Sequence, residues 1–80
     1  MKLNELLDVL AYGTKVHLHD TRLPERFKPA AFQMEGPDDC EPGYVSIDDV
    51  RGWRCDEMTV ESVDVIGEAM FVYASPDWLL

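Results

Sequence analysis

Four side chains of the sequence have the chemistry of zinc ligands. His17 and His19 are separated by one residue, and the chain contains two cysteines, Cys40 and Cys55. Imidazole and thiolate groups bind zinc, and a His-x-His strand presents both imidazoles on one face. Structural zinc sites usually contain closely spaced cysteine pairs, however, and neither cysteine here has such a neighbour. We therefore predict no bound metal and no cofactor, and we keep a small zinc-stabilised domain as an alternative.

Patterns typical of catalysis are absent from the sequence. A nucleophile needs a neighbouring base, and acid–base chemistry needs positioned groups of shifted pKa. Ser46, Ser62 and Ser75 lie outside any nucleophile motif, and the sequence has no Gly-rich phosphate loop and no His-Glu-x-x-His. A domain of 80 residues also has little room for a buried pocket. We predict that the protein is not an enzyme.

The acidic side chains are concentrated in one part of the chain. Residues 35–80 hold twelve of the sixteen Asp and Glu residues but only Arg51 and Arg54 as basic ones, and the net charge is −9. No calcium-loop spacing is present. Such a charge repels phosphates and attracts basic surfaces. We therefore expect a protein partner with a basic surface and no direct contact with nucleic acid; the alternative is that the charge serves only solubility.

The residues expected to contact this partner are acidic side chains on predicted loops and turns, joined by one tryptophan as an apolar anchor. They are Asp38, Asp39, Glu41, Asp48, Asp49, Asp56, Glu57 and Trp53. The alternative role of the tryptophan is to fill the core.

The first part of the chain predicts a helix followed by a strand. Leucines recur at i, i+3, i+4 and i+7 from Leu3 to Leu10, which indicates a helix over residues 2–11 with Gly13 as its C-cap. Residues 14–20 then alternate between apolar and polar side chains, as in a half-buried strand. Residues 22–34 are less regular because of Pro24 and Pro29, and a short strand is possible only at 31–34.

The second part predicts a loop, a short turn and a hairpin. Residues 35–43 are rich in Pro, Gly and acids, and we expect this loop to be extended or mobile. Residues 44–47 fit a short strand, whereas Ser46 with Asp49 fits a capping box that starts a turn at 47–52; both interpretations stay open. Strands at 58–66 and 69–74 are joined by Gly67-Glu68 as a two-residue turn, and residues 75–77 resemble a helix start.

Together these elements predict an α+β fold in a single domain, residues 1–80. We expect a small antiparallel sheet of three or four strands, with the N-terminal helix packed on one face. The longest apolar runs are far shorter than the roughly 18 residues of a membrane span, and the N-terminus lacks a signal-peptide core. These features predict an intracellular protein without membrane contact, in which the cysteines are thiols.

The two ends of the chain resemble small phage and prophage proteins. The opening, residues 1–20, is a Leu-rich helix that runs through Gly13-Thr14 into a strand, and residues 60–73 resemble the closing hairpin of those proteins. Some proteins of this size and charge are anti-CRISPR proteins, which resemble this chain in being acidic α+β domains. The resemblance implies an inhibitor that binds the basic DNA-reading groove of a CRISPR effector in the host cytoplasm, as a DNA mimic.

Two other functions are compatible with the same residues. The protein could be a general protein–protein interaction module or a phage regulator without enzymatic activity. Its binding would then be insensitive to salt and would depend on Trp53 or Trp78. The zinc-stabilised domain is the other alternative. The oligomeric state does not follow from the sequence.

Overall fold

The structure is a computed structural model that describes residues 1–24, 28–52 and 58–76. The elements in chain order are α1 (Leu3–Leu7), β1 (Lys15–Asp20), β2 (Ala30–Gln33), β3 (Val45–Ser46), α2 (Ile47–Gly52), β4 (Thr59–Ile66) and β5 (Ala69–Ser75). Within the described ranges, neither helix has the length and apolar character needed to cross a membrane.

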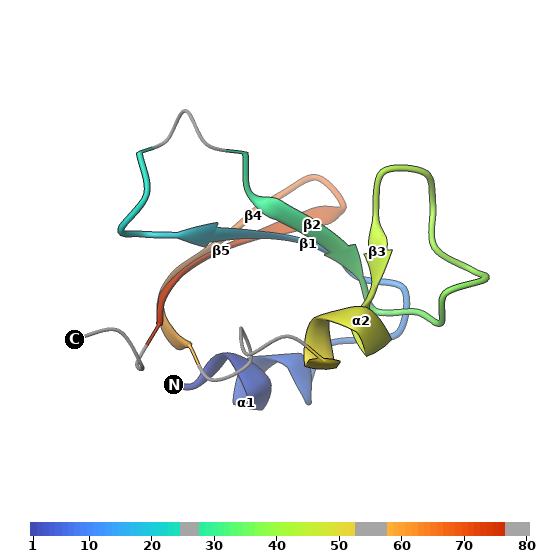
Figure 1. Cartoon of the computed structure of the whole chain (residues 1–80), viewed down its shortest axis with the longest axis horizontal. Coiled ribbons are helices and arrows are strands. Elements are labelled where there is room, and N and C mark those ends of the chain that lie inside the picture. Colours follow the sequence, from blue (N-terminus) through green and yellow to red (C-terminus); the bar gives the residue numbers. More distant parts are fainter. Residues whose placement is uncertain (25–27, 53–57, 77–80) are drawn as a thin grey trace.

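The strands form one five-stranded sheet in the order β3-β2-β1-β5-β4. The pairs β1–β2 and β4–β5 are antiparallel, whereas β1–β5 and β2–β3 are parallel. The small α+β fold is thus confirmed, but the prediction of three or four antiparallel strands is not exact. The difference arises because the chain crosses from β3 through α2 before it forms β4 and β5, so that β5 returns beside β1 in the same direction (Figure 1).

Both helices lie on one side of the sheet, and the core fills the space between them and the strands (Figure 1). Leu3, Leu6 and Leu7 of α1 are buried, as the leucine spacing predicts. They form a cluster with buried side chains on alternate positions of the central strands, and Phe32 of β2 is among the largest fully buried side chains. Alternation places the remaining residues of β1 and β5 on the opposite face, which we call the outer face.

The first helix is shorter than the predicted range 2–11. It ends at Leu7, after which Val9 N–H donates to the Leu6 carbonyl (3.1 Å) and Leu10 N–H to that of Leu7 (3.4 Å). Gly13 has φ +91° but does not cap the helix. It lies in the turn into β1, where its N–H donates to the Met34 carbonyl at 2.8 Å. This turn leads the chain from α1 into β1, and it takes up the residues expected to extend the helix.

The two interpretations of residues 44–52 are both correct in part. Val45–Ser46 forms the short edge strand β3, and α2 follows directly. Ser46 begins the helix because its Oγ accepts a hydrogen bond from the Asp48 N–H at 3.1 Å. Val50 of α2 is fully buried against the core. The hydrogen bond to Ser46 therefore stabilises the start of α2, and the buried Val50 packs the helix against the core.

The C-terminal hairpin is confirmed in position and turn. Strands β4 and β5 are joined at Gly67, which has φ +63°, a conformation that glycine adopts without strain. Strand β4 contains a bulge between Val60 and Ser62. The predicted helix start at residues 75–77 extends beyond the described residues.

Candidate functional site: an acidic corner beside the sheet

The loop that follows β2 is fastened to the sheet by Gln33. This side chain is 5% exposed, and its Nε2 donates to Glu35 Oε2 at 2.7 Å while its Oε1 accepts from the Glu41 N–H at 2.8 Å. Ser46 Oγ also donates to the Glu35 carbonyl at 2.6 Å. The loop is therefore not extended, which was one of the two expectations for it: hydrogen bonds fold it back against β2 and β3.

Turns inside the loop bring its acidic residues close to α2. Asp39 N–H donates to the Gly36 carbonyl at 3.1 Å, and Cys40 Sγ lies 3.4 Å from the same carbonyl. The pKa of the Cys40 thiol is raised, first by burial and then by the negative charges of Glu35, Asp39, Asp49 and Asp48. Carboxylates from the loop and from the first turn of α2 thus lie within electrostatic range of one sulfur atom.

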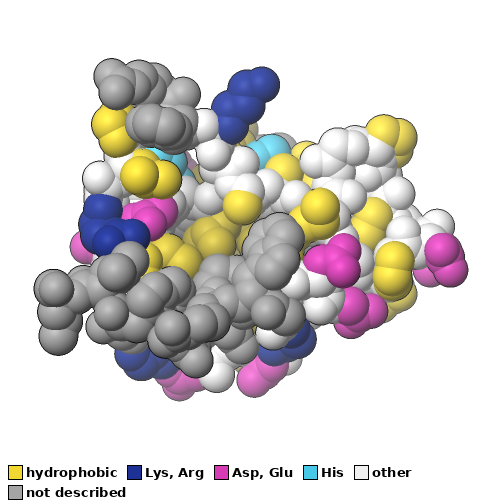
Figure 2. Space-filling model, in the orientation of Figure 1, with side chains coloured by type: hydrophobic (Ala, Val, Ile, Leu, Met, Phe, Trp, Pro, Cys, Tyr) yellow, Lys and Arg dark blue, Asp and Glu magenta, His cyan; other side chains and the backbone are white. Residues whose placement is uncertain are grey.

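We call this cluster the acidic corner. Its members are the carboxylates whose charges act on the Cys40 thiol, namely Glu35, Asp39, Asp48 and Asp49, together with Asp38, which directly precedes Asp39 in the chain. Four of these, the two Asp-Asp pairs, are exposed. Figure 2 shows several separate acidic side chains on the side of the molecule where Figure 1 places the loop and α2, and others at its opposite and lower edges. The structure therefore brings together three of the eight residues predicted to bind a partner, Asp39, Asp48 and Asp49, and a fourth, Asp38, is the chain neighbour of Asp39.

The remaining predicted contact residues have other positions. Glu41 forms an ion pair with Lys15, with Glu41 Oε2 2.6 Å from Lys15 Nζ, and this hydrogen bond is the main cause of the raised pKa of Lys15. The charge of Glu41 is thus largely balanced, and it contributes less to the acidic field. Trp53, Asp56 and Glu57 lie outside the described residues.

The candidate zinc ligands are not brought together within the described part of the chain. His17 and His19 share the outer face of β1 as predicted, but Cys40 faces the loop carbonyls. No group of three or more His, Cys, Asp or Glu residues suited to a metal ion occurs among the described residues. Cys55 lies outside them, so the four-ligand set itself stays untested.

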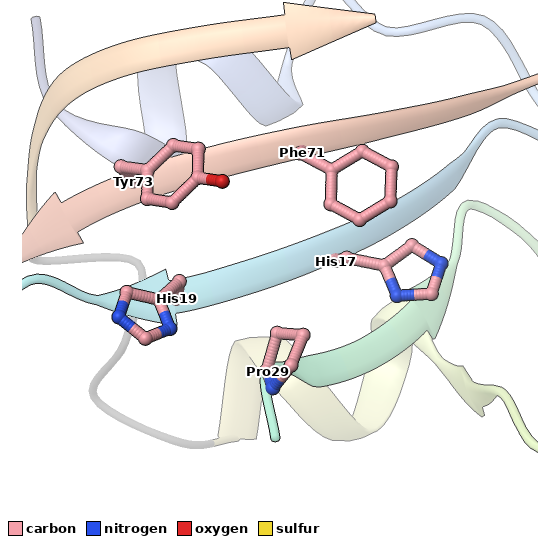
Figure 3. Close-up of a pocket in the computed structure, with 5 residues that line it drawn as sticks. All are labelled: His17, His19, Pro29, Phe71 and Tyr73. Carbon is pink, nitrogen blue, oxygen red and sulfur yellow. The ribbon is translucent and has the colours of Figure 1, made fainter. Parts of the chain in front are cut away.

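The outer face carries a second feature that the sequence alone did not reveal. A hollow of about 270 Å³ is lined by His17, His19, Pro29, Phe71 and Tyr73 (Figure 3). The parallel register places His17 beside Phe71 and His19 beside Tyr73. The alternation within each strand was visible in the sequence, but the pairing of β1 with β5 was not, and this pairing creates the hollow.

Comparison with known proteins gave no match: no family model, no curated protein and no solved structure is detectably similar to this chain. The fold and the site therefore define only a class, a small α+β domain with a mixed five-stranded sheet and an acidic corner. Any narrower assignment has to come from the chemistry of its surfaces.

The convergence of carboxylates on Cys40 predicts that its thiol reacts slowly with alkylating reagents. A raised pKa leaves less thiolate at a given pH, so alkylation by iodoacetamide at pH 8 should be slower than for an exposed cysteine peptide. In a Cys55→Ser background, Asp39→Asn with Asp48→Asn should accelerate the reaction, because two negative charges near the sulfur are removed. Glu61→Gln, on the hairpin, should leave the rate unchanged. An equal rate in all three proteins would contradict the arrangement of the corner.

Proposed function

We propose that the protein is a non-catalytic binding protein whose acidic corner docks onto a basic surface of another protein. The observation that carries this proposal is the convergence of three exposed carboxylates, Asp39, Asp48 and Asp49, from two separate segments onto one corner, with the exposed Asp38 next to Asp39 in the chain. Like charges repel one another, so their gathering in the folded state is unfavourable unless a partner of opposite charge compensates it. Charge that serves only solubility does not require this gathering.

The partner we propose is the nucleic-acid-binding groove of a host defence complex, and the activity is inhibition by DNA mimicry in the host cytoplasm. Grooves that bind DNA are lined with Lys and Arg, which contact phosphates spaced along the strand. Carboxylates held on a folded loop and on a helix can occupy the positions of such phosphates. The net charge of −9, and the resemblance of the two ends of the chain to small phage proteins, support this choice over an arbitrary basic protein.

Charge-neutralising variants test the role of the corner. We expect Asp38→Asn/Asp39→Asn and Asp48→Asn/Asp49→Asn each to weaken binding to a purified CRISPR effector complex by about twofold to thirtyfold, since each variant removes two ion pairs and each exposed ion pair contributes roughly 0.2–1 kcal/mol. The matched control is Glu61→Gln/Glu68→Gln, which removes the same charge from exposed positions of the hairpin.

The comparison between the variants decides the proposal. Weaker binding by the two corner variants, with the hairpin control close to wild type, supports docking through the corner. Equal losses of affinity in all three variants would indicate that only the net charge matters. Unchanged affinity in all three would indicate that the charge serves only solubility. Either of these two results contradicts the proposal.

A further inference from the structure

The hollow on the outer face is formed by two neighbouring pairs of rings, which we call the ring array. His17 and Phe71 stack with centroids 4.8 Å apart and planes 15° from parallel, and His19 lies 5.6 Å from Tyr73 with planes 59° apart. Pro29 closes one side (Figure 3). The five lining side chains are aromatic or apolar, and none is an acid, a lysine or an arginine. The hollow therefore suits a flat group that stacks on rings.

The array is held in place on the side of His17. His17 Nε2 lies 3.0 Å from the Tyr44 hydroxyl, and the two rings meet edge to face with centroids 5.5 Å apart. In contrast, the Tyr73 hydroxyl has no hydrogen-bond partner within the described ranges. It points along the sheet toward Phe71 (Figure 3). A ligand in the hollow would thus meet ordered rings and one available hydroxyl group.

The charge beside the hollow is negative on the β4 side. Asp64 lies directly opposite Phe71 in the antiparallel register, and cross-strand partners share a face. Asp64 is exposed and forms no ion pair within the described part of the chain. Lys15, on the same face, is already paired with Glu41, so it does not compensate Asp64. A cation in the hollow would therefore have, beside Phe71 on the same face, a carboxylate that forms no ion pair with the described residues.

A cation–aromatic contact already exists on this face. Lys15 Nζ lies 5.7 Å from the centroid of the Tyr44 ring, within the range of a cation–π interaction. Phe71 and Tyr73 have no such cation among the described residues. The net charge of −9 further raises the local concentration of cations and lowers that of phosphates.

We propose that the hollow binds an arginine side chain of a basic protein partner. The guanidinium group is planar, weakly hydrated and suited to stacking on aromatic rings. Its N–H groups would donate to the Tyr73 hydroxyl and to the Asp64 carboxylate, while its plane lies against the rings of Phe71 and Tyr73. A nucleobase would also stack on such rings. In a nucleotide or nucleic acid, however, the base is accompanied by phosphates, which this acidic chain repels. An arginine side chain therefore fits the observed charges better.

Lys28 distinguishes the two ligands. It is exposed and directly precedes Pro29, which lines the hollow. Its positive charge opposes an incoming guanidinium but favours a phosphate. Neutralisation by Lys28→Gln should therefore leave arginine binding equal or tighter, whereas binding of a nucleotide would become weaker.

The test is a nuclear magnetic resonance titration of the full chain with argininamide, lysinamide and adenosine monophosphate as separate probes. We expect argininamide to shift the ring signals of His19, Phe71 and Tyr73 at millimolar concentration, more strongly than lysinamide does. Asp64→Asn and Tyr73→Leu should reduce these shifts at least threefold. Val65→Thr is the control, since Val65 is exposed on the opposite face of the sheet.

Two results would overturn the proposal. One is the absence of ring-face shifts with argininamide in the wild-type protein, which requires no variant to fold. The other is a stronger response to adenosine monophosphate that Lys28→Gln abolishes, which would assign the hollow to a nucleotide. Failure of this proposal is separable from failure of the acidic corner, because the Asp38→Asn/Asp39→Asn variant should retain the ring-face shifts.

Discussion

Replacement of Phe32 by alanine should remove a large part of the stability of the domain. Phe32 is fully buried in β2, at the centre of the cluster formed by the sheet and α1. Truncation of a buried phenylalanine costs about 3–5 kcal/mol, since it loses apolar burial and leaves a cavity. A domain of this size has a total unfolding free energy of roughly 4–12 kcal/mol. Urea unfolding followed by circular dichroism should show this loss directly.

The control for Phe32→Ala is Val65→Ala. Val65 is 64% exposed on the edge strand β4, and its truncation should change the unfolding free energy by less than about 0.5 kcal/mol. A loss below about 1 kcal/mol for Phe32→Ala would contradict the arrangement of the core.

Replacement of Gln33 by leucine should release the loop that carries the acidic corner. The substitution leaves the Glu35 carboxylate without its donor and the Glu41 N–H without its acceptor. A buried donor or acceptor that is left without its hydrogen-bond partner costs about 1–3 kcal/mol of stability. We expect this loss of stability and, more specifically, faster hydrogen exchange at the Glu41 amide, because that amide is bonded to the Gln33 side chain.

Asn4→Leu provides the matched control, since it makes a similar polar-to-apolar change at an exposed position of α1. It should leave exchange at Glu41 unchanged. If Gln33→Leu also leaves that exchange unchanged, Gln33 does not hold the loop, and the corner must be ordered by other contacts.

Local patterns in the sequence predicted the elements well where each element follows its own periodicity. The leucine stripe marked the buried side of α1, the alternation marked β1, and the turn at Gly67 marked the hairpin. The end of α1 was predicted too late, because the apolar spacing continues to Leu10 while the chain already turns back. Leu10 still packs against the core, but from a turn instead of a helix.

The pairing of strands could not be predicted from the same patterns. Alternation indicates which residues share a face, but it is identical for a parallel and an antiparallel neighbour. That β5 lies parallel to β1 depends on the path of the chain through α2. The ring array of the outer face follows from this register, so it appears only once the strand order is known.

The acidic corner was predicted in composition but not in geometry. All four Asp residues of the corner are exposed, as predicted; Asp38 and Asp39 lie in the loop, whereas Asp48 and Asp49 belong to the first turn of the helix α2. Their convergence depends on Gln33 and Ser46, two polar side chains that are buried by the loop they bind. Nothing in the residues around Gln33 distinguishes it from an exposed glutamine, so the folded loop was missed.

The measurement that tests the central claim most directly is the binding of the wild-type protein to purified CRISPR effector complexes across a salt series, with target DNA as competitor. If the acidic corner occupies a DNA-binding groove, affinity should fall at least tenfold between about 50 and 200 mM salt, and target DNA should displace the protein. Binding that is insensitive to salt and unaffected by DNA, or no binding to any effector, would contradict the account.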